Sequence, residues 1–241
     1  SDAISVDLCD LCFNENEKIN ETEFTQPAIL TLEYGIFEFM KEKGFTADYF
    51  AGHSLGEYSA LLSAGVFDLE DAVRLVRKRG ELMQKATPLG TGAMAAVILN
   101  DIENSNARSI ILKTGAEIAN INSKDQWVIS GSSENVKLAS DELELQLKDV
   151  RIVPLTVSAP FHSSLMKPIE VKFSDYLKQI NMRLENSECV LSNFTGTFHK
   201  KEEVIENLTK QISGTVRWVE NMRALIATNS SIIEIGPNKP L

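Results

Sequence analysis

The chain has 241 residues, 43% of them hydrophobic and 24% charged, which is the balance of a globular protein and not of a disordered segment. Its formal charge of -10 argues against a general nucleic-acid or anionic-membrane binder, and no apolar run reaches membrane-spanning length. Three cysteines, an odd number, make no disulfide framework, so we expect a reducing cytoplasm.

Residues 4–24 predict a helix followed by an irregular connector rich in Asn and Glu. Cys9 and Cys12 form a CxxC pair within residues 6–13, where the apolar spacing suits a helix face. No second pair completes a zinc site, so we expect both cysteines to be structural.

A second helix is expected to begin at about Thr25, because Pro27 follows and proline is favoured in a first turn. Gly44 ends this helix. Its predicted buried face consists of Ala28, Leu32, Gly35, Ile36 and Phe39.

Gly52, Ser54 and Gly56 form the Gly-x-Ser-x-Gly pattern of a nucleophile elbow. A strand ends at residues 49–51, the backbone turns sharply at the serine, and a helix follows over residues 55–64. The glycines let strand and helix approach without a Cβ clash. The helix N-terminus points free N–H groups at whatever forms on the serine. An ordinary tight turn gives the same pattern by chance, but the strand–turn–helix setting favours the elbow.

A helix is expected over residues 69–86, with Asp68 as its N-cap, and one of its charged residues falls on the apolar face. Arg79 sits in the centre of the apolar face, between Val76 and Met83. An arginine there needs an anionic partner or opens into a cleft. The alternatives are a structural salt bridge and a side chain that reaches solvent.

The middle of the chain has the element order β-α-β-β-α-β, which is typical of a ferredoxin-like fold. We expect residues 92–158 to form an inserted subdomain, and residues 1–91 and 159–241 to form the core. Its strands are expected at residues 92–99, 117–122, 126–131 and 150–157, and its helices at residues 102–114 and 133–148.

The last third continues the alternation of helices and strands. Helices are expected at residues 163–180, 201–212 and 216–228, and strands at residues 190–194 and 231–235. Such alternation predicts an α/β core with a mostly parallel sheet covered on both faces.

A serine nucleophile needs a base, and the chain has three histidines. His53 adjoins Ser54, and neighbouring side chains diverge. His199 lies in a polar turn, so we expect it at the surface. His162 follows a predicted strand, where α/β proteins place functional loops, and is the base by elimination. No acidic residue is placed to orient it, so we expect a backbone carbonyl to do so.

These segments resemble malonyl-CoA:acyl-carrier-protein transacylases over essentially the whole chain. The active-site segment of that family is similar to residues 52–61, and further segments match in order at residues 25–28, 75–84, 90–96, 120–123, 158–163 and 234–237. The resemblance implies an α/β-hydrolase-like core with an inserted ferredoxin-like subdomain.

The resemblance also implies roles for particular residues. Ser54 is the acylated nucleophile, His162 is its base, and Arg79 binds the free carboxylate of malonyl. The N–H of Leu55 contributes to the oxyanion hole, and the backbone carbonyl of Gln211 orients the histidine.

Further substrate-binding residues are expected around the acyl group. Phe161 precedes the base, so its ring is expected to crowd the carbon next to the thioester. In related polyketide domains a phenylalanine there accompanies malonyl, and a serine accompanies methyl-branched units. We also place Met83 and Asn122 among the substrate-binding residues.

One family feature has no match in this sequence. Family members begin with a strand and a Gly-Gln-Gly-Ser-Gln turn whose glutamine N–H supplies half of the oxyanion hole. The sequence also ends at Leu241, before the family's closing segments, so we expect a fragment. Removing one oxyanion donor costs about 10²–10³ in rate.

The sequence therefore predicts an [acyl-carrier-protein] S-malonyltransferase of fatty acid biosynthesis that works through a malonyl-serine intermediate. Its expected partners are malonyl-CoA and acyl carrier protein, with no nucleic acid, membrane, cofactor or metal, and we expect a monomer. The alternatives are a discrete polyketide acyltransferase, a serine hydrolase or thioesterase, and a non-catalytic docking module. A hydrolase would want an Asp or Glu between the serine and the histidine, and has no use for Arg79.

Overall fold

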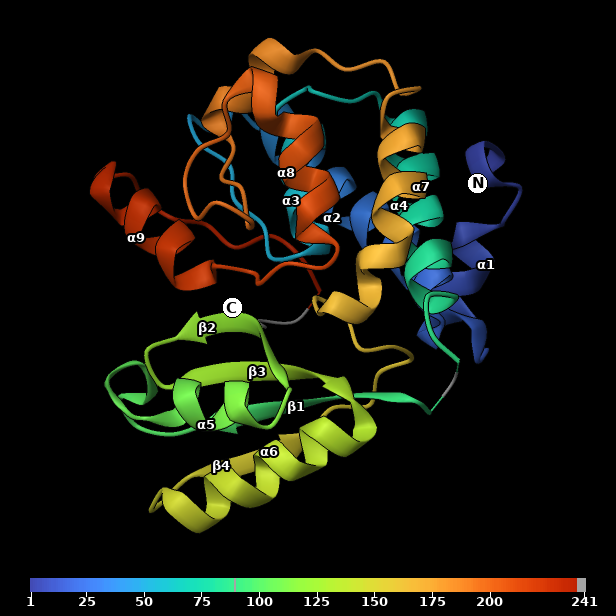
Figure 1. Cartoon of the computed structure of the whole chain (residues 1–241). Coiled ribbons are helices and arrows are strands. Elements are labelled where there is room, and N and C mark those ends of the chain that lie inside the picture. Colours follow the sequence, from blue (N-terminus) through green and yellow to red (C-terminus); the bar gives the residue numbers. More distant parts are fainter. Residues whose placement is uncertain (89, 238–241) are drawn as a thin grey trace.

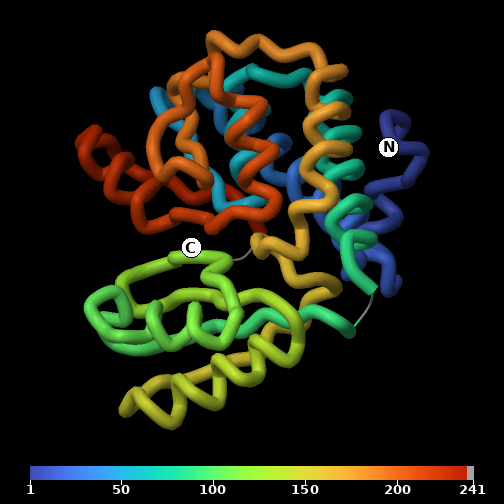
Figure 2. The backbone as a smooth tube through the Cα atoms, in the orientation of Figure 1, coloured from blue at the N-terminus to red at the C-terminus, as the bar shows by residue number. Residues whose placement is uncertain are grey.

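The computed structural model describes residues 1–88 and 90–237 of the chain. Figure 1 shows a mixed α/β fold in which a body of helices lies against a small sheet. We call the helices within residues 8–84 and 167–227 the helical part, and residues 92–154, which hold the sheet and two helices, the sheet part. Figure 2 shows that the sheet part is one continuous stretch of the chain, entered once and left once.

The helical part is built from seven helices within the described residues. They are α1 (Leu8–Phe13), α2 (Thr22–Glu42), α3 (Leu55–Ser63), α4 (Leu69–Gln84), α7 (Lys167–Leu177), α8 (Val204–Gln211) and α9 (Trp218–Ala227). Short 3₁₀ turns lie at Asp2–Ile4, Lys18–Asn20, Ile102–Asn104, Ser164–Met166, Leu184–Cys189 and Lys201–Glu203. No helix of the described residues is both long and apolar enough to span a bilayer.

The sheet part has the element order that the sequence predicts. Its elements are β1 (Gly92–Ile98), α5 (Ala107–Lys113), β2 (Glu117–Ser123), β3 (Gln126–Ser132), α6 (Ser133–Gln146) and β4 (Arg151–Pro154). The spatial order is β2-β3-β1-β4, and every neighbouring pair is antiparallel. β4 is shorter than the expected strand over residues 150–157.

The two faces of the sheet bury different side chains, because successive residues of a strand point to opposite faces. On one face, Ala95 and Val97 pack with α5 and α6. On the other, Met94 and Ala96 form a small cluster that Phe161 contacts. Phe161 also packs on the core of the helical part, so it lies where the two parts meet.

In the core, the described residues form isolated parallel β-bridges where the sequence predicts a parallel sheet. Phe50 and Val190 form one parallel bridge, and Val216 forms another with Asn120 of β2. The predicted strand over residues 231–235 is wrong, because Ile232 and Ile233 are each 52% exposed and pair with no strand among the residues that the structure describes. An apolar run reads as a strand, but only a neighbouring strand can satisfy its backbone.

The start of α2 and its buried face also differ from expectation. The helix begins at Thr22, so Pro27 lies inside it. Proline leaves the carbonyl four residues earlier without its helical donor, and Arg77 Nη1 donates to that Glu23 oxygen at 3.3 Å. The residues that are buried are Gln26, Pro27, Ala28, Leu30 and Phe37, whereas Leu32 and Phe39 are exposed. Apolar residues occur all round this helix, so periodicity does not select a face.

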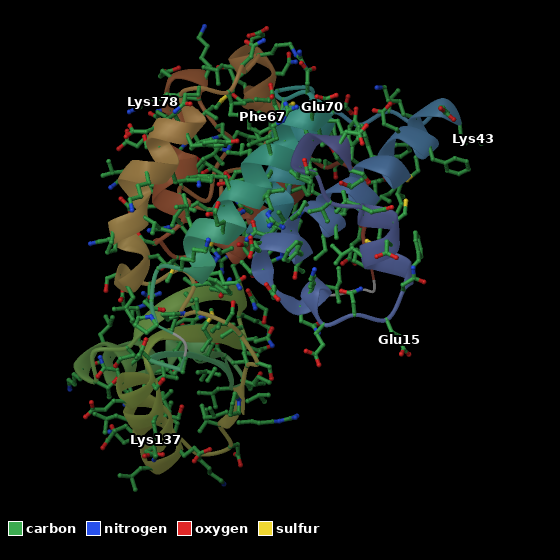
Figure 3. All side chains as sticks on the ribbon, turned by 90° about the vertical axis from the view of Figure 1, so that its right-hand side faces the viewer. Glu15, Lys43, Phe67, Glu70, Lys137 and Lys178 are labelled. Carbon is green, nitrogen blue, oxygen red and sulfur yellow. The ribbon has the colours of Figure 1, made fainter. Side chains whose placement is uncertain are left out.

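The CxxC pair likewise lies on the outer side of its helix. α1 forms as predicted, but Cys9 and Cys12 are exposed, and Leu8 and Leu11 take the buried side. Elsewhere on the surface, charged side chains such as Lys43, Lys137 and Lys178 point away from the body of the chain (Figure 3).

Candidate active site

Ser54 occupies a strained turn between Phe50 and the first residue of α3. Its φ of 53° and ψ of -99° lie outside the regions that residues with a Cβ usually adopt. A Cβ placed on Gly52 would lie 2.0 Å from the carbonyl carbon of Gly56, so the glycine is required there. The predicted elbow is confirmed in its turn and helix, whereas the preceding strand is a single bridge at Phe50.

Ser54 and His162 form a hydrogen-bonded pair. Ser54 Oγ lies 2.8 Å from His162 Nε2, and His162 Nδ1 lies 2.8 Å from the main-chain oxygen of Gln211. A carbonyl can only accept, so Nδ1 carries the proton and Nε2 presents its lone pair to the serine hydroxyl. The structure therefore brings together the predicted serine, histidine and carbonyl.

His162 is held in its neutral form. Burial, with a further contribution from the nearby Arg79 guanidinium, lowers the pKa of His162 to about 3. The side chain is 4% exposed, and its φ of 57° is positive like that of Ser54. A neutral imidazole facing a hydroxyl is the form that can take a proton.

Arg79 lies on the other side of the serine and is 2% exposed. Its Nη2 donates to Ser54 Oγ at 3.0 Å and to Gln211 Oε1 at 2.8 Å, and its Nη1 donates to Gln26 Oε1 at 2.8 Å. All three partners are neutral, and Arg79 forms no ion pair within residues 1–88 and 90–237. Both alternatives considered for Arg79, a structural salt bridge and a solvent-reaching side chain, are therefore wrong.

The α2–α4 packing fixes the position of this arginine. A Cβ on Gly80 would lie 2.6 Å from the Cα of Glu23, so α2 and α4 touch backbone to backbone next to Arg79. The same packing brings Gln26 of α2 to the guanidinium. Nε of Arg79 has no partner in the described part of the chain.

The remaining predicted residues lie around this centre. Met83 is buried in the core, with its sulfur 4.0 Å from Gln26 Nε2. Asn122 Oδ1 lies 2.9 Å from His53 Nε2, which ties β2 to the elbow. The N–H of Leu55, at the start of α3, makes no hydrogen bond with any residue that the structure describes.

Three buried polar residues near the site, Glu57, Asn193 and His199, were not predicted to lie there. Glu57 is 0% exposed and contacts Gln211, the Asn193 backbone and His199. The prediction that His199 is a surface residue is wrong, since it is 2% exposed with Nε2 2.8 Å from Glu57 Oε1. The polar turn is at the surface, but this side chain points inward. One signal was available, because Glu57 is the sole charged residue of α3.

A cavity of about 460 Å³ opens beside His162, between the helical part and the sheet part. Its lining includes the cationic residues Arg108, Lys167, Lys210 and Arg217, and the carboxylates Glu117 and Glu170. Lys210 pairs with Glu170 at 3.0 Å, whereas Arg108, Lys167 and Arg217 pair with no carboxylate of the described residues. Among those residues, no group of three or more His, Cys, Asp or Glu side chains is arranged to hold a metal ion.

Comparisons with known proteins identify a family to which the chain is similar. An acyl transferase domain model matches residues 3–239. The malonyl CoA-acyl carrier protein transacylase of Bacillus subtilis is 39% identical over 245 residues, which is 100% of this chain and 77% of that protein. The transacylase structure from Clostridium perfringens superimposes with a TM-score of 0.91 at 37% identity, over 99% of this chain and 76% of that one.

A further solved structure is that of a type II PKS acyl-carrier protein in complex with its malonyl-transacylase. It matches with a TM-score of 0.91 and 36% identity, over 99% of this chain and 78% of the other. Each of these similarities extends over both the helical part and the sheet part. The chain therefore belongs to the acyl transferase domain family.

Proposed function

We propose that this chain transfers a malonyl group from malonyl-CoA to the phosphopantetheine thiol of acyl carrier protein, in fatty acid biosynthesis. The observation that carries the proposal is the placement of Ser54 between two groups. A neutral imidazole lies 2.8 Å from the hydroxyl on one side, and a guanidinium that has no ion-pair partner within residues 1–88 and 90–237 lies 3.0 Å away on the other. Relatives at 39% and 40% identity bear the name malonyl CoA-acyl carrier protein transacylase.

In the first half-reaction, His162 Nε2 takes the hydroxyl proton as Ser54 Oγ attacks the thioester carbonyl. The N–H of Leu55 is one donor for the resulting oxyanion. The tetrahedral intermediate then collapses, the C–S bond breaks, and the proton on His162 passes to the departing CoA sulfur. The product is a malonyl ester of Ser54.

Arg79 supplies the specificity for a dicarboxylic acyl group. Once Oγ carries the acyl group, the Nη2 proton that it accepted becomes available to the malonyl carboxylate. A guanidinium binds a carboxylate through charge-assisted hydrogen bonds, and a buried cation disfavours an acyl group that leaves it unpaired. Gln26 accepts a hydrogen bond from Nη1 and Gln211 accepts one from Nη2, which fixes the orientation of the guanidinium.

In the second half-reaction, the thiol of the carrier protein is the nucleophile that attacks the malonyl ester of Ser54. His162 removes its proton, the sulfur attacks the ester carbonyl, and the Ser54 oxygen leaves with that proton. The cavity beside His162 is the proposed entrance, because the unpaired cations Arg108, Lys167 and Arg217 suit the phosphate of a phosphopantetheine arm.

The fold proposed for this activity follows the division that the sequence predicts. Residues 92–158 are proposed to be a ferredoxin-like subdomain, supported by the antiparallel order β2-β3-β1-β4 with α5 and α6 on one face. Residues 1–91 and 159–241 are proposed to form an α/β-hydrolase-like core, supported by the elbow at Ser54; residues 89 and 238–241 lie outside the described residues. A monomeric state and a cytoplasmic location stay predictions.

A polyketide carrier is the second candidate acceptor, because one similar structure is a complex with a type II PKS acyl-carrier protein. The test of both candidates is a two-step experiment. Malonyl-CoA should label the intact protein, and the label should then move to a holo carrier protein, faster to a fatty-acid carrier than to a polyketide carrier. Release of free malonate as fast as transfer to either carrier would instead support a hydrolase.

A further inference from the structure

Glu57 is a buried carboxylate that the mechanism above does not use. It is 0% exposed, and each partner that the described residues supply to its carboxylate donates a hydrogen bond. Oε2 accepts from Gln211 Nε2 at 2.7 Å and from the Asn193 N–H at 2.9 Å. Oε1 lies 2.8 Å from His199 Nε2. Asn207 Nδ2 lies 3.3 Å from His199 Nδ1, so Nδ1 accepts and Nε2 carries the proton that Glu57 receives.

The Gln211 side chain connects this carboxylate to the arginine. Its Nε2 donates to Glu57 and, at 2.9 Å, to the main-chain oxygen of Ser54. Its Oε1 accepts from Arg79 Nη2 at 2.8 Å. A glutamine amide has one accepting end and one donating end. Because Glu57 can only accept, it fixes the amide with the oxygen toward Arg79, and a flipped amide would set N–H groups against the guanidinium.

A second branch from Glu57 reaches the strained turn. Asn193, whose N–H donates to Glu57, accepts the Ser54 N–H at 2.6 Å and donates to the Gly52 oxygen at 2.9 Å. Both sides of the serine are thereby held, which a backbone with a φ of 53° requires of its surroundings.

We propose that Glu57 is a positioning residue for malonyl selection: it sets the direction of the Gln211 amide and so holds Arg79 ready for the acyl carboxylate. This inference rests on the function proposed above. Only a carboxylate suits the position, because donors face it from Gln211, Asn193 and His199, and a glutamine would turn an NH₂ group toward one of them.

The test is Glu57→Gln, which keeps the size and removes the second acceptor. Acylation of Ser54 is measured with malonyl-CoA and with p-nitrophenyl acetate, a neutral ester that needs no cation. The ratio of the malonyl rate to the neutral-ester rate should fall about tenfold, the effect typical of losing one hydrogen bond to a charged group. Glu81→Gln, on the solvent side of α4 where Glu81 pairs with Lys78 and Lys85, is the matched control and should leave both rates unchanged.

Equal losses for the two esters in Glu57→Gln would overturn the proposal, because a merely structural carboxylate lowers both rates together. If that variant does not fold, the same ratio is measured in Gln211→Met, where it should also fall. This substitution removes the side-chain amide and keeps the main-chain oxygen bonded to His162. An unchanged ratio in Gln211→Met overturns the proposal as well. A wild-type chain that takes no malonyl at all would refute the proposed function, and this inference with it.

Discussion

Arg79 Nη2 lies 3.0 Å from Ser54 Oγ, although Arg79 is on α4 and Ser54 lies in the turn before α3, and the arginine forms no ion pair within the described residues. A buried cation is costly unless it is paired, so its position beside a nucleophile calls for an anionic ligand. The malonyl carboxylate supplies that anion in the proposed reaction. The two flanking glutamines, Gln26 and Gln211, hold the guanidinium in place while leaving its charge uncompensated.

Ser54→Ala should abolish covalent labelling by malonyl-CoA, because the variant has no oxygen at the elbow to acylate. The measurement is the mass of the intact protein after incubation with malonyl-CoA. Alanine keeps a Cβ at the strained turn, so its thermal transition serves as the control for folding. A malonyl adduct on a folded Ser54→Ala variant would assign the nucleophile to another residue.

The pH dependence should reflect the low pKa of His162. Because this pKa lies at about 3, the base stays deprotonated, and acylation by p-nitrophenyl acetate should be level between about pH 8 and pH 5. His162→Gln should lower the rate by about 10²–10⁴ at every pH in that range. A wild-type rate that falls with an apparent pKa near 6.5 would contradict the assigned environment.

The same histidine predicts how stability depends on pH. Its pKa is about 3 when folded, against 6.5 for the unfolded group, so unfolding takes up a proton below about pH 6.5. The stabilisation is present above that pH and is lost as the pH falls toward 3, by about 1.4 kcal/mol per pH unit. Urea midpoints at several pH values should therefore fall less steeply for His162→Gln than for the wild type, and parallel curves would refute this assignment.

Two glycine substitutions should act in opposite directions on stability. Gly80→Ala places a Cβ 2.6 Å from the Glu23 Cα, so it should force α2 and α4 apart and destabilise the chain by about 1–3 kcal/mol. Gly35→Ala, inside α2 with no atom within 4 Å of the added Cβ, should stabilise it by up to about 1 kcal/mol. Urea unfolding measures both. A neutral effect of Gly80→Ala would mean that the two helices are less closely packed in solution.

Phe161 should restrict the carbon next to the thioester. Its half-buried ring packs on both the helical part and the sheet part, next to His162. Phe161→Ser should therefore admit methylmalonyl-CoA, and the kcat/KM for methylmalonyl-CoA relative to malonyl-CoA should rise. An unchanged ratio would show that the ring does not face the acyl group.

Two site residues could be predicted from the sequence because they depart from the usual pattern of the segment around them. Ser54 stood out through its glycines, and Arg79 because a charge lay within an apolar helix face. His162 came from elimination among three histidines. For Ser54 and Arg79 the informative feature is local, because it lies within one tight turn or one or two turns of helix, whereas His162 required a comparison of all three histidines of the chain.

The supporting network could not be predicted in the same way. Glu57 is far in the sequence from Asn193, His199 and Gln211, and only the tertiary structure shows that donors of these three residues converge on its carboxylate. The resemblance had implied a role only for the main-chain carbonyl of Gln211. The buried face of α2 also depends on tertiary packing, since α4 contacts it at Gly80 and leaves Leu32 and Phe39 exposed. The network around Glu57 and the buried face of α2 both depend on which segment packs against them, and a pattern of side chains along the sequence does not identify that segment.

The role of Arg79 in binding the acyl carboxylate is tested by the substrate preference of Arg79→Ala, measured as kcat/KM for malonyl-CoA and acetyl-CoA with wild type and variant. Arg79→Lys is included because an ammonium keeps the charge but lacks the planar pair of donors. We expect Arg79→Ala to lose malonyl transfer while acetyl transfer is kept or rises, and Arg79→Lys to lie between wild type and alanine. A malonyl-to-acetyl ratio that is the same in wild type and Arg79→Ala would show that Arg79 does not bind the acyl carboxylate.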